Sequence, residues 1–245
     1  MDRNNFFDSY LTNHYSNCEK TNFNIKADVL SLLNRNLPLL NHNFEKLFRD
    51  SVSKKSNILD LGCGYGSFLY FLKSHGYNNV YGVDISTEEI QLCKKMFGSY
   101  KLYRKDAFDF INNTNQKFEV IYLSHVLEHI KKDQLFDFLN GIRKILSKNG
   151  QLIMVVPNSA AYFNSAANRY GDYTHQIGFT DVSLKQVLMM TKYSKVTVKN
   201  YFGVGNILVN FFRIILLKMF EIFIQTIGYD KQTVYTPSIL VYAKK

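Results

Sequence analysis

Glycine recurs at every second position of residues 62–66, directly after a short apolar run and Asp60. Glycine tolerates positive φ angles and leaves room for a ligand to approach the backbone. The helix expected directly behind this run would present unbonded N–H groups at its start. The run therefore predicts a buried strand that ends in a ligand-binding turn, the alternative being a turn whose glycines serve only close packing. The candidate ligand-binding residues here are Asp60, Gly62, Cys63, Gly64 and Gly66.

A second acidic residue, Asp84, closes the short apolar strand expected at 79–83. It follows the glycine turn by roughly 20 residues, the offset at which a doubly wound α/β fold places a carboxylate on ribose hydroxyls. One carboxylate can accept from both hydroxyls, and such charge-assisted bonds are strong. The alternative role for Asp84 is that of an acid near a helix start, because residues 86–89 are typical of a helix N-terminus. An NAD-dependent oxidoreductase is disfavoured, since Ser67 stands where the third glycine of G-x-G-x-x-G belongs.

Two groups of polar residues have the types needed to handle a proton. His125, Glu128 and His129 follow an apolar run, and their i, i+3, i+4 spacing places them on one helix face. Asp172 and His175 lie in a polar loop, where a carboxylate can orient and charge-stabilise a histidine base. Each group has a structural alternative: a supporting hydrogen-bond network for the first, and a histidine that braces its own loop for the second.

The spacing D-x-G-x-G-x-G at 60–66 resembles motif I of the class I S-adenosylmethionine-dependent methyltransferases, and three further motifs follow at that family's spacings over residues 55–157. The resemblance implies S-adenosylmethionine as methyl donor and S-adenosylhomocysteine as product. It also implies that Asp106 bonds the adenine amino group, while Ala107 and Phe108 border the ring. The remaining donor-site residues on this basis are Asp84, Ile85 and Ser124.

The string 124–130 is similar to the motif that follows the fourth strand in ubiquinone-type and sugar-type O-methyltransferases. In the ubiquinone type the matching triplet is an acid–acid–histidine metal set; here His125 replaces the first acid, which leaves a metal site open. The pattern D-x-T-H-x-x-x-F-T at 172–180 resembles methyltransferases of bacterial capsule and lipopolysaccharide pathways. We expect His175 to accept the proton of an acceptor hydroxyl. The candidate catalytic residues are His175, Asp172, His129 and His125.

Apolar runs that alternate with helical patterns predict an α/β fold with a mostly parallel sheet. The resemblance makes this a Rossmann-like sheet of seven strands in the order 3-2-1-4-5-7-6, with helices on both faces. We expect a helical N-terminal cap at 1–50 and a methyltransferase domain at 51–245. Within that domain, an acceptor-side loop and a helical insertion occupy about 158–235, before the last strand.

The stretch 207–227 is long and mostly apolar, which raises the question of a transmembrane helix. Its polar residues fall within about 140° of arc at 100° per residue, so we expect an amphipathic helix over 205–228. These residues are Asn210, Arg213, Lys218, Glu221 and Gln225. The helix has three interpretations: packing on the sheet or in a homodimer contact, peripheral contact with the inner membrane face, or a true span, which its three charges disfavour.

Composition sets the remaining limits. A chain of 245 residues suits one domain with a sizeable core. The net charge of +10 favours an anionic partner, such as a phosphorylated substrate, nucleic acid or a membrane surface, or it only keeps the surface solvated. Three scattered cysteines (Cys18, Cys63 and Cys93) argue against a disulfide framework or zinc site and for a reducing compartment. The N-terminus lacks the features of a secretory signal, so we expect a cytoplasmic enzyme.

These features predict an enzyme that O-methylates a sugar, or a sugar-attached phosphate-type group, of a surface-polysaccharide precursor. Its partner would be an anionic small molecule or glycan precursor. O-methylation of a quinone or other metabolite is the main alternative, followed by N-methylation of an amino sugar, methylation of RNA and a non-enzymatic binding module. Nucleic-acid methylation is disfavoured because Pro38, Pro157 and Pro237 form neither an N/D-P-P-Y/F motif nor a Pro-Cys dipeptide.

Overall fold

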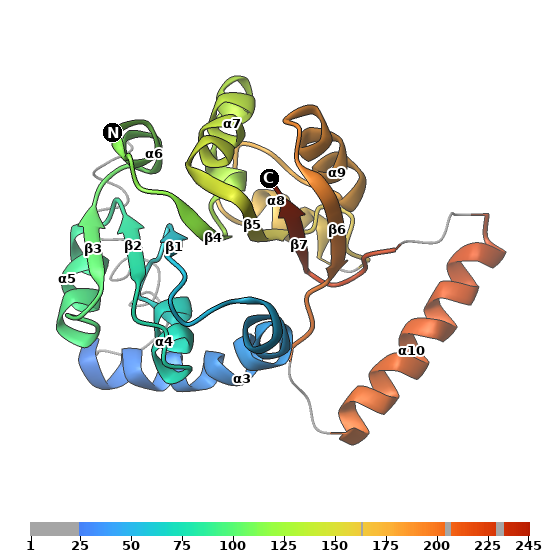
Figure 1. The fold of residues 1–245 in the computed structure, drawn as a ribbon. Helices are drawn as coiled ribbons and strands as arrows, with labels where there is room; N and C mark the ends of the chain where they lie inside the picture. The colour runs from blue at the N-terminus through green and yellow to red at the C-terminus, as the bar shows by residue number, and fades with distance from the viewer. Residues whose placement is uncertain (1–24, 163, 204–206, 229–232) are drawn as a thin grey trace.

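The computed structural model describes residues 25–162, 164–203, 207–228 and 233–245. Within these ranges, one sheet of seven strands has the order β3-β2-β1-β4-β5-β7-β6 (Figure 1). β7 is antiparallel to both β5 and β6, whereas the other neighbouring strands are parallel. The predicted fold class is confirmed. The strands are β1 (Ile58–Leu61), β2 (Val80–Asp84), β3 (Lys101–Arg104), β4 (Phe118–Ser124), β5 (Leu146–Pro157), β6 (Ser194–Asn200) and β7 (Ser238–Lys244).

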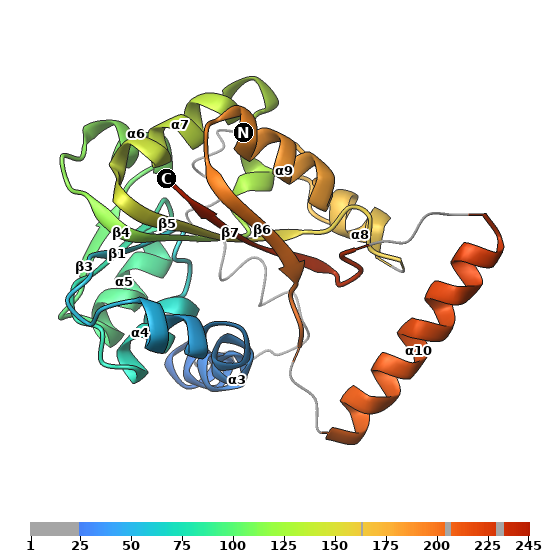
Figure 2. The same cartoon turned by 45° about the vertical axis from the view of Figure 1, so that its right-hand side comes forward.

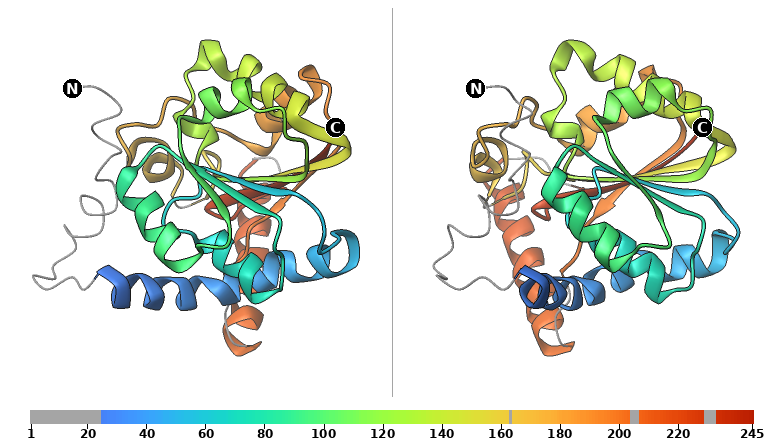
Figure 3. Two further views of the ribbon diagram at one scale, coloured as in Figure 1. Left: turned by 60° about the vertical axis from the view of Figure 1, so that its left-hand side comes forward. Right: turned by 90° about the vertical axis from the view of Figure 1, so that its left-hand side faces the viewer.

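Helices cover both faces of this sheet, with α3, α4 and α5 on one face and α6, α7 and α9 on the other (Figure 2). Their bounds are α3 (Ile25–Ser51), α4 (Ser67–Ser74), α5 (Thr87–Met96), α6 (Ala107–Asn113), α7 (Leu135–Ile145), α8 (Ser165–Tyr170), α9 (Asp181–Met190) and α10 (Ile207–Thr226), with 3₁₀ turns at Leu127–His129 and Lys132–Gln134. The first part of the cap predicted at 1–50 lies outside the described residues. Its remainder is α3, which runs along the same side of the sheet as α4 (Figure 3). The domain boundary after residue 50 stays a prediction.

The central strands supply side chains to a core on each face. In β1, Ile58 packs on the α3–α5 side, while Leu59 and Leu61 pack on the α6–α9 side. All four β1 residues are buried, as expected for a parallel strand that is covered on both faces. This double burial explains the apolar run in the sequence. Asp60 is the exception, because it places a carboxyl group at a buried position of the strand.

The start of β5 contains a local turn signal. Gly150 favours a turn before the strand, but residues 146–150 belong to the strand itself. Leu146 is fully buried and pairs with Phe118 of β4, after which the register shifts before Val120. Burial of Leu146 in the sheet therefore outweighs the local turn signal of Gly150.

The strand directions bring several chain segments to one edge. Ligands of open α/β sheets bind outside the carboxyl ends of the parallel strands. β6 ends at this same edge, because Asn200 pairs with Ile239 while Pro157, at the end of β5, pairs with Ser238. The insertion that carries α10 therefore leaves and rejoins the sheet where the turns after β1 and β2 lie.

α10 stands apart from the rest of the molecule (Figures 1 and 2). It contacts the body through Phe220, whose ring meets that of Tyr162 edge-on at a centroid distance of 4.9 Å. The interpretation that this helix packs on the sheet is therefore wrong, because other helices already cover both faces. Among the helices of the described chain, none combines the length and the apolar character needed to cross a bilayer.

Candidate active site

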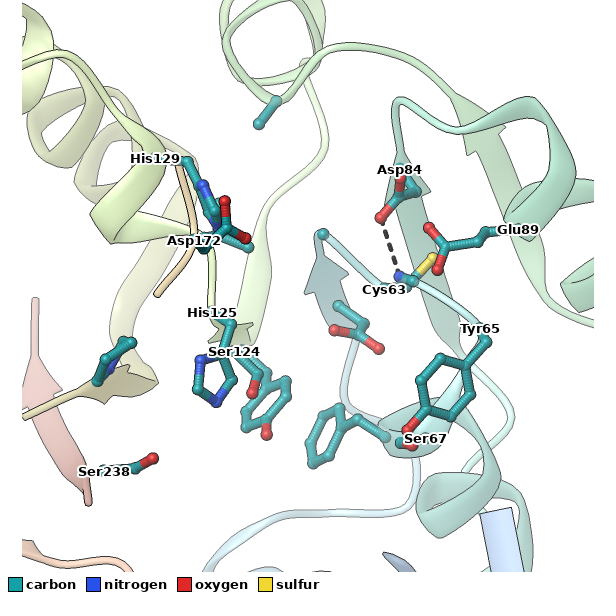
Figure 4. A pocket seen from close by; sticks show the side chains of 18 of the residues that line it. Cys63, Tyr65, Ser67, Asp84, Glu89, Ser124, His125, His129, Asp172 and Ser238 are labelled. Atoms are coloured by element: carbon teal, nitrogen blue, oxygen red, sulfur yellow. Dashed lines mark hydrogen bonds between the residues drawn. The ribbon is translucent and has the colours of Figure 1, made fainter. Parts of the chain in front are cut away.

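A cavity of about 790 Å³ lies at the carboxyl edge of the sheet. We call its two sides the donor wall, formed by the turns after β1, β2 and β3, and the acceptor wall, formed after β4 and β5. Figure 4 shows the two groups facing each other. The predicted residues on the donor wall are Asp60, Gly62, Cys63, Gly64, Asp84, Ile85, Asp106 and Ala107; those on the acceptor wall are Ser124, His125, His129, Asp172 and His175.

The glycine turn has the predicted conformation, with positive φ at all three glycines. A Cβ on Gly62 would collide with Val126, and one on Gly66 would stand 2.6 Å from the Phe97 ring. Gly64 faces the cavity, and its φ of 49° is the feature that favours glycine there. The close-packing alternative thus holds for Gly62 and Gly66. Gly66 is the N-cap of α4 and does not line the cavity, so its role as a ligand contact stays a prediction.

Asp84 braces the glycine turn from the end of β2. Its Oδ2 accepts from the Gly64 N–H at 2.9 Å, and its Oδ1 accepts from the Ser86 N–H at 2.9 Å. Burial raises the pKa of Asp84 and outweighs these hydrogen bonds, which lower it. Each carboxylate oxygen has a second lone pair, so both remain able to accept from a ligand diol.

Two further carboxyl groups are buried in the donor wall. Asp60 is 2% exposed, and its Oδ2 accepts no hydrogen bond from the described residues. Burial, and then the charge of Asp84, raise the pKa of Asp60 well above its usual value. Burial likewise raises the pKa of Glu89 to about 9, with help from Asp84. An ammonium group on a ligand would give Asp60 the partner that it lacks.

The next predicted pair, Asp106 and Phe108, follows β3. Asp106 lines the cavity, and its Oδ1 caps α6 by accepting from the N–H groups of Phe108 at 2.8 Å and Asp109 at 3.4 Å. Phe108 was expected beside the adenine ring, but it packs instead on Phe138 of α7 at a centroid distance of 4.9 Å. Phe108 is the second residue of α6, and this position faces the core instead of the cavity.

α3 supplies lining residues that the sequence did not indicate. Asn36 donates to Tyr65 Oη at 2.7 Å and to Ser67 Oγ at 3.2 Å, and all three residues line the cavity. Glu89 is a further lining residue that was expected only as an acid in the first turn of a helix. No local pattern marks these positions, because about 30 residues separate Asn36 from its partners.

Glu128 is buried next to the acceptor-wall histidines, outside the cavity lining, with 1% of its side chain exposed. Its Oε1 is 3.3 Å from His125 Nδ1 and 4.0 Å from His175 Nε2, and neither oxygen receives a well-aligned hydrogen bond from the described residues. Burial lowers the pKa of His125, but contact with Glu128 raises it by more. A buried carboxylate without donors is unfavourable, so Glu128 favours positive charge on the groups around it.

A chain of hydrogen bonds orients His129. Thr174 Oγ1 donates to Asp172 Oδ1 at 2.6 Å and lies 2.8 Å from His129 Nδ1. Because the hydroxyl has one proton, it accepts from the Nδ1–H of His129. Burial lowers the pKa of His129, which keeps the ring neutral. Burial raises the pKa of Asp172, but its two hydrogen bonds from Thr174 lower it by more.

His175 is oriented by the backbone. Its Nδ1 lies 3.0 Å from the Asn168 carbonyl oxygen, so Nδ1 carries the proton and Nε2 keeps the lone pair. The predicted Asp172–His175 pair is thus wrong in its connection, although both residues line the cavity. The Thr174 N–H donates to Asp172 at 2.8 Å and holds its carboxylate away from His175. Asp172 therefore acts on His129, through the Thr174 hydroxyl.

The acceptor wall also fits a divalent cation. Glu128, His129 and His175 each offer one ligand atom, and these atoms lie within 4.8 Å of one another. Carboxylate oxygen and imidazole nitrogen suit first-row transition metals, and Glu128 lacks other donors. His175 takes the place that the resemblance gave to His125. A bound cation would supply Lewis acidity at an acceptor oxygen.

The family model for the methyltransferase domain matches residues 32–192, more than half of the chain. The chain belongs to this methyltransferase domain family. The match runs from within α3 to just beyond α9 and includes both walls of the cavity.

Curated relatives of this methyltransferase share its central part. Carboxy-S-adenosyl-L-methionine synthase from Campylobacter hominis is 27% identical over 150 residues, which are 57% of this chain and 64% of that protein. The tRNA U34 carboxymethyltransferase from Alteromonas mediterranea is 30% identical over 135 residues, which are 49% of this chain and 39% of that protein. The chain thus spans less than two thirds of the length of either relative.

Solved structures share the fold. An S-adenosylmethionine-dependent methyltransferase from Archaeoglobus fulgidus superposes with a TM-score of 0.64 and 22% identity, over 86% of this chain and 94% of that one. Magnesium protoporphyrin IX methyltransferase from Synechocystis, solved with bound S-adenosylmethionine, has a TM-score of 0.58 and 13% identity, over 100% and 98% of the two chains. The architecture is therefore that of the class I S-adenosylmethionine-dependent methyltransferases.

Proposed function

We propose that the chain transfers the methyl group of S-adenosylmethionine to an oxygen of a sugar, or of a phosphate-type group on a sugar, in a surface-polysaccharide precursor. One observation carries the proposal: two differently built walls face a single cavity of about 790 Å³. The donor wall offers carboxylates to a ribose and an ammonium group. The acceptor wall offers three histidines around a buried carboxylate.

The donor wall suits S-adenosylmethionine at both ends of the methionine–ribose unit. Asp84 has one remaining lone pair on each oxygen for the two ribose hydroxyls, while Gly64 leaves its side of the turn open. Asp60 Oδ2 receives no hydrogen bond from the described chain and would accept from the ammonium group. These contacts would hold the activated methyl group toward the acceptor wall.

The acceptor wall suits removal of a proton from a hydroxyl. Methyl transfer from a sulfonium is an in-line displacement, so the protein aligns the acceptor and takes its proton. His175 is the base in this proposal, because the Asn168 carbonyl fixes its tautomer with the lone pair on Nε2. Glu128, 4.0 Å away, would stabilise the imidazolium ion that forms.

The loop that forms this wall supports the choice of acceptor. Asp172, Thr174 and His175 belong to the pattern at 172–180 that resembles capsule and lipopolysaccharide methyltransferases, and they provide the polar side of the cavity. The net charge of +10 suits a phosphorylated precursor. O-methylation of a quinone or other metabolite would use the same base and is the competing acceptor class.

The name of one relative, the tRNA U34 carboxymethyltransferase, favours a second candidate, transfer of a carboxymethyl group. A carboxylated sulfonium donor would bring another anion next to Glu128. Among the described lining residues, Lys105 is the side chain with a permanent positive charge, and it lies beside Asp106 on the donor wall. Methyl transfer therefore agrees better with the charges of the cavity.

Mass analysis of capsule and lipopolysaccharide, with and without the gene, tests the proposal. We expect loss of one methyl group from a defined residue, restored by the wild-type gene and not by a His175→Ala version. Loss of a carboxymethyl group would favour the second candidate. An unchanged glycan would remove the polysaccharide acceptor and leave the quinone or small-metabolite class.

A further inference from the structure

α10 exposes large apolar side chains between Phe211 and Phe223. Six of them are more than half exposed: Phe211, Phe212, Leu216, Met219, Ile222 and Phe223. At 100° per residue these six fall within about 140° of the helix circumference. They form one continuous surface, which we call the apolar arc.

The side of α10 that faces the body is mixed. Leu217, Phe220 and Ile224 are only partly exposed there, and so is Glu221. A surface helix of a globular protein buries its apolar stripe on the core, but the six residues of the apolar arc lie on the opposite side of α10. α10 therefore presents its apolar arc to something outside the chain.

Hydrogen bonds hold the segments on either side of the insertion near the cavity. Asn200 Oδ1 accepts from the N–H groups of Tyr235 at 2.9 Å and Thr236 at 3.1 Å. Asn158 Nδ2 donates to the Thr236 carbonyl at 2.9 Å. Ser238, two residues further on, lines the cavity. Whatever covers α10 therefore lies close to the acceptor entrance.

Exposed aromatic residues of the α8 region and a lysine of α10 point to the chemistry of the partner. Tyr173 is 99% exposed and Tyr170 is 77% exposed, and both lie in the α8 region at the same sheet edge. Tyrosine is typical of the boundary between lipid and water. Lys218 is exposed at the margin of the apolar arc, where its stem can cover apolar surface while its ammonium group reaches headgroups.

We propose that α10 lies in the surface of a lipid bilayer that carries anionic headgroups, with its apolar arc among the acyl chains. The net charge of +10 complements such a surface. A second copy of the chain fits less well, because a paired-helix seam is narrower than this arc and would leave part of it in water. The inference rests on α10 and not on the proposed acceptor. If both hold, the precursor is lipid-linked.

Vesicle sedimentation of the full chain tests the inference. The probes are vesicles of phosphatidylcholine alone and of phosphatidylcholine mixed with phosphatidylglycerol. We expect the chain to sediment with the mixed vesicles and less with the neutral ones. The Leu216→Asp/Phe223→Asp variant should bind the mixed vesicles at least about tenfold more weakly. The matched control, Val182→Asp/Met189→Asp, alters two exposed apolar residues of α9 and should bind as the wild type does.

Three results would overturn the inference: wild-type chain that stays in solution with both vesicles, an α10 variant that binds as tightly as the wild type, or a dimer by light scattering without vesicle binding. Calorimetry with S-adenosylhomocysteine on the same samples keeps the two proposals separate. If a variant no longer binds vesicles but binds S-adenosylhomocysteine normally, its defect is confined to α10. If the wild-type chain binds vesicles but not S-adenosylhomocysteine, the proposed function is refuted and the inference about the apolar arc stands.

Discussion

The two walls of the cavity are held by different kinds of contact. On the donor wall, the Asp84 carboxylate is bonded to main-chain N–H groups of Gly64 and Ser86, so strand and turn geometry place it. On the acceptor wall, His129 is held through the Thr174 side chain, 45 residues away. The donor carboxylate is thus placed by main-chain contacts between neighbouring strands, with Asn36 of α3 adding side-chain contacts to the turn, whereas the acceptor wall is held by side chains from two distant loops.

This difference suggests which parts of the site stay constant among proteins of one fold and which parts vary from one enzyme to another. Replacing a loop after β5 would alter Asp172, Thr174 and His175 together without moving the glycine turn. The same fold could therefore keep one donor while it changes acceptors. Substitutions on the two walls should have separable effects on donor binding and on turnover.

The largest effect is expected from the acceptor wall. His175→Ala should lower kcat by about 10²–10⁴-fold, the usual loss when a general base is removed, with unchanged affinity for S-adenosylhomocysteine. The measurement is turnover at saturating acceptor, once the glycan comparison has identified it, with calorimetry in parallel. Tyr173→Ala is the matched control, since Tyr173 is 99% exposed in the same loop. Normal turnover of the His175 variant would refute its role as base.

The next effect belongs to the donor wall. Asp84→Ala should weaken binding of S-adenosylhomocysteine by about 1.5–3 kcal/mol, the scale of hydrogen bonds to a charged group. Calorimetry measures this directly, and Asp109→Ala, which alters an exposed acid outside the cavity, should bind normally. Wild-type affinity in the Asp84 variant would remove this residue from the donor site.

The third effect concerns stability. The pKa of Glu89 is about 9 in the folded chain, against an ordinary value of 4.5, so the folded state holds a proton that the unfolded state releases. Its stabilising contribution is full below about pH 4.5 and is lost as pH rises toward 9, at up to about 1.4 kcal/mol per pH unit. Glu89→Gln should flatten this decline between pH 5 and 9 in thermal unfolding. Parallel curves for the variant and the wild type would contradict a buried, protonated Glu89.

The parts of the molecule that were predictable from the sequence are those with local causes. The donor-wall residues Gly64 and Asp84 follow from short motifs whose spacing reflects one strand, one turn and one helix, whereas the strand order followed from the family resemblance of those motifs. Phe108 was misplaced because motif position does not tell which side of α6 a side chain faces. The Asp172–Thr174–His129 chain was missed for a different reason: it joins two loops, and sequence spacing carries no information about which hydroxyl lies between an acid and a histidine.

For α10, too, the sequence does not tell which side of the element faces the body. The pattern of Arg213, Lys218 and Glu221 predicted an amphipathic helix correctly, and α10 is that helix. The pattern does not say which way the helix turns its apolar side. That depends on whether the sheet still has an uncovered face, which is decided by α3 and α9, far away in the sequence.

The position of β7 has a consequence for the order of folding. β6 is synthesised before β7, yet it joins the described sheet only through β7, which pairs with β5 on its other side. A nascent chain that has released β6 therefore holds a strand with no place in the sheet until β7 has left the ribosome. A premature stop just before Ser238 would leave β5 with an open edge and β6 unpaired, a state that invites aggregation. The final seven-residue strand thus acts as the closing step in the assembly of the sheet.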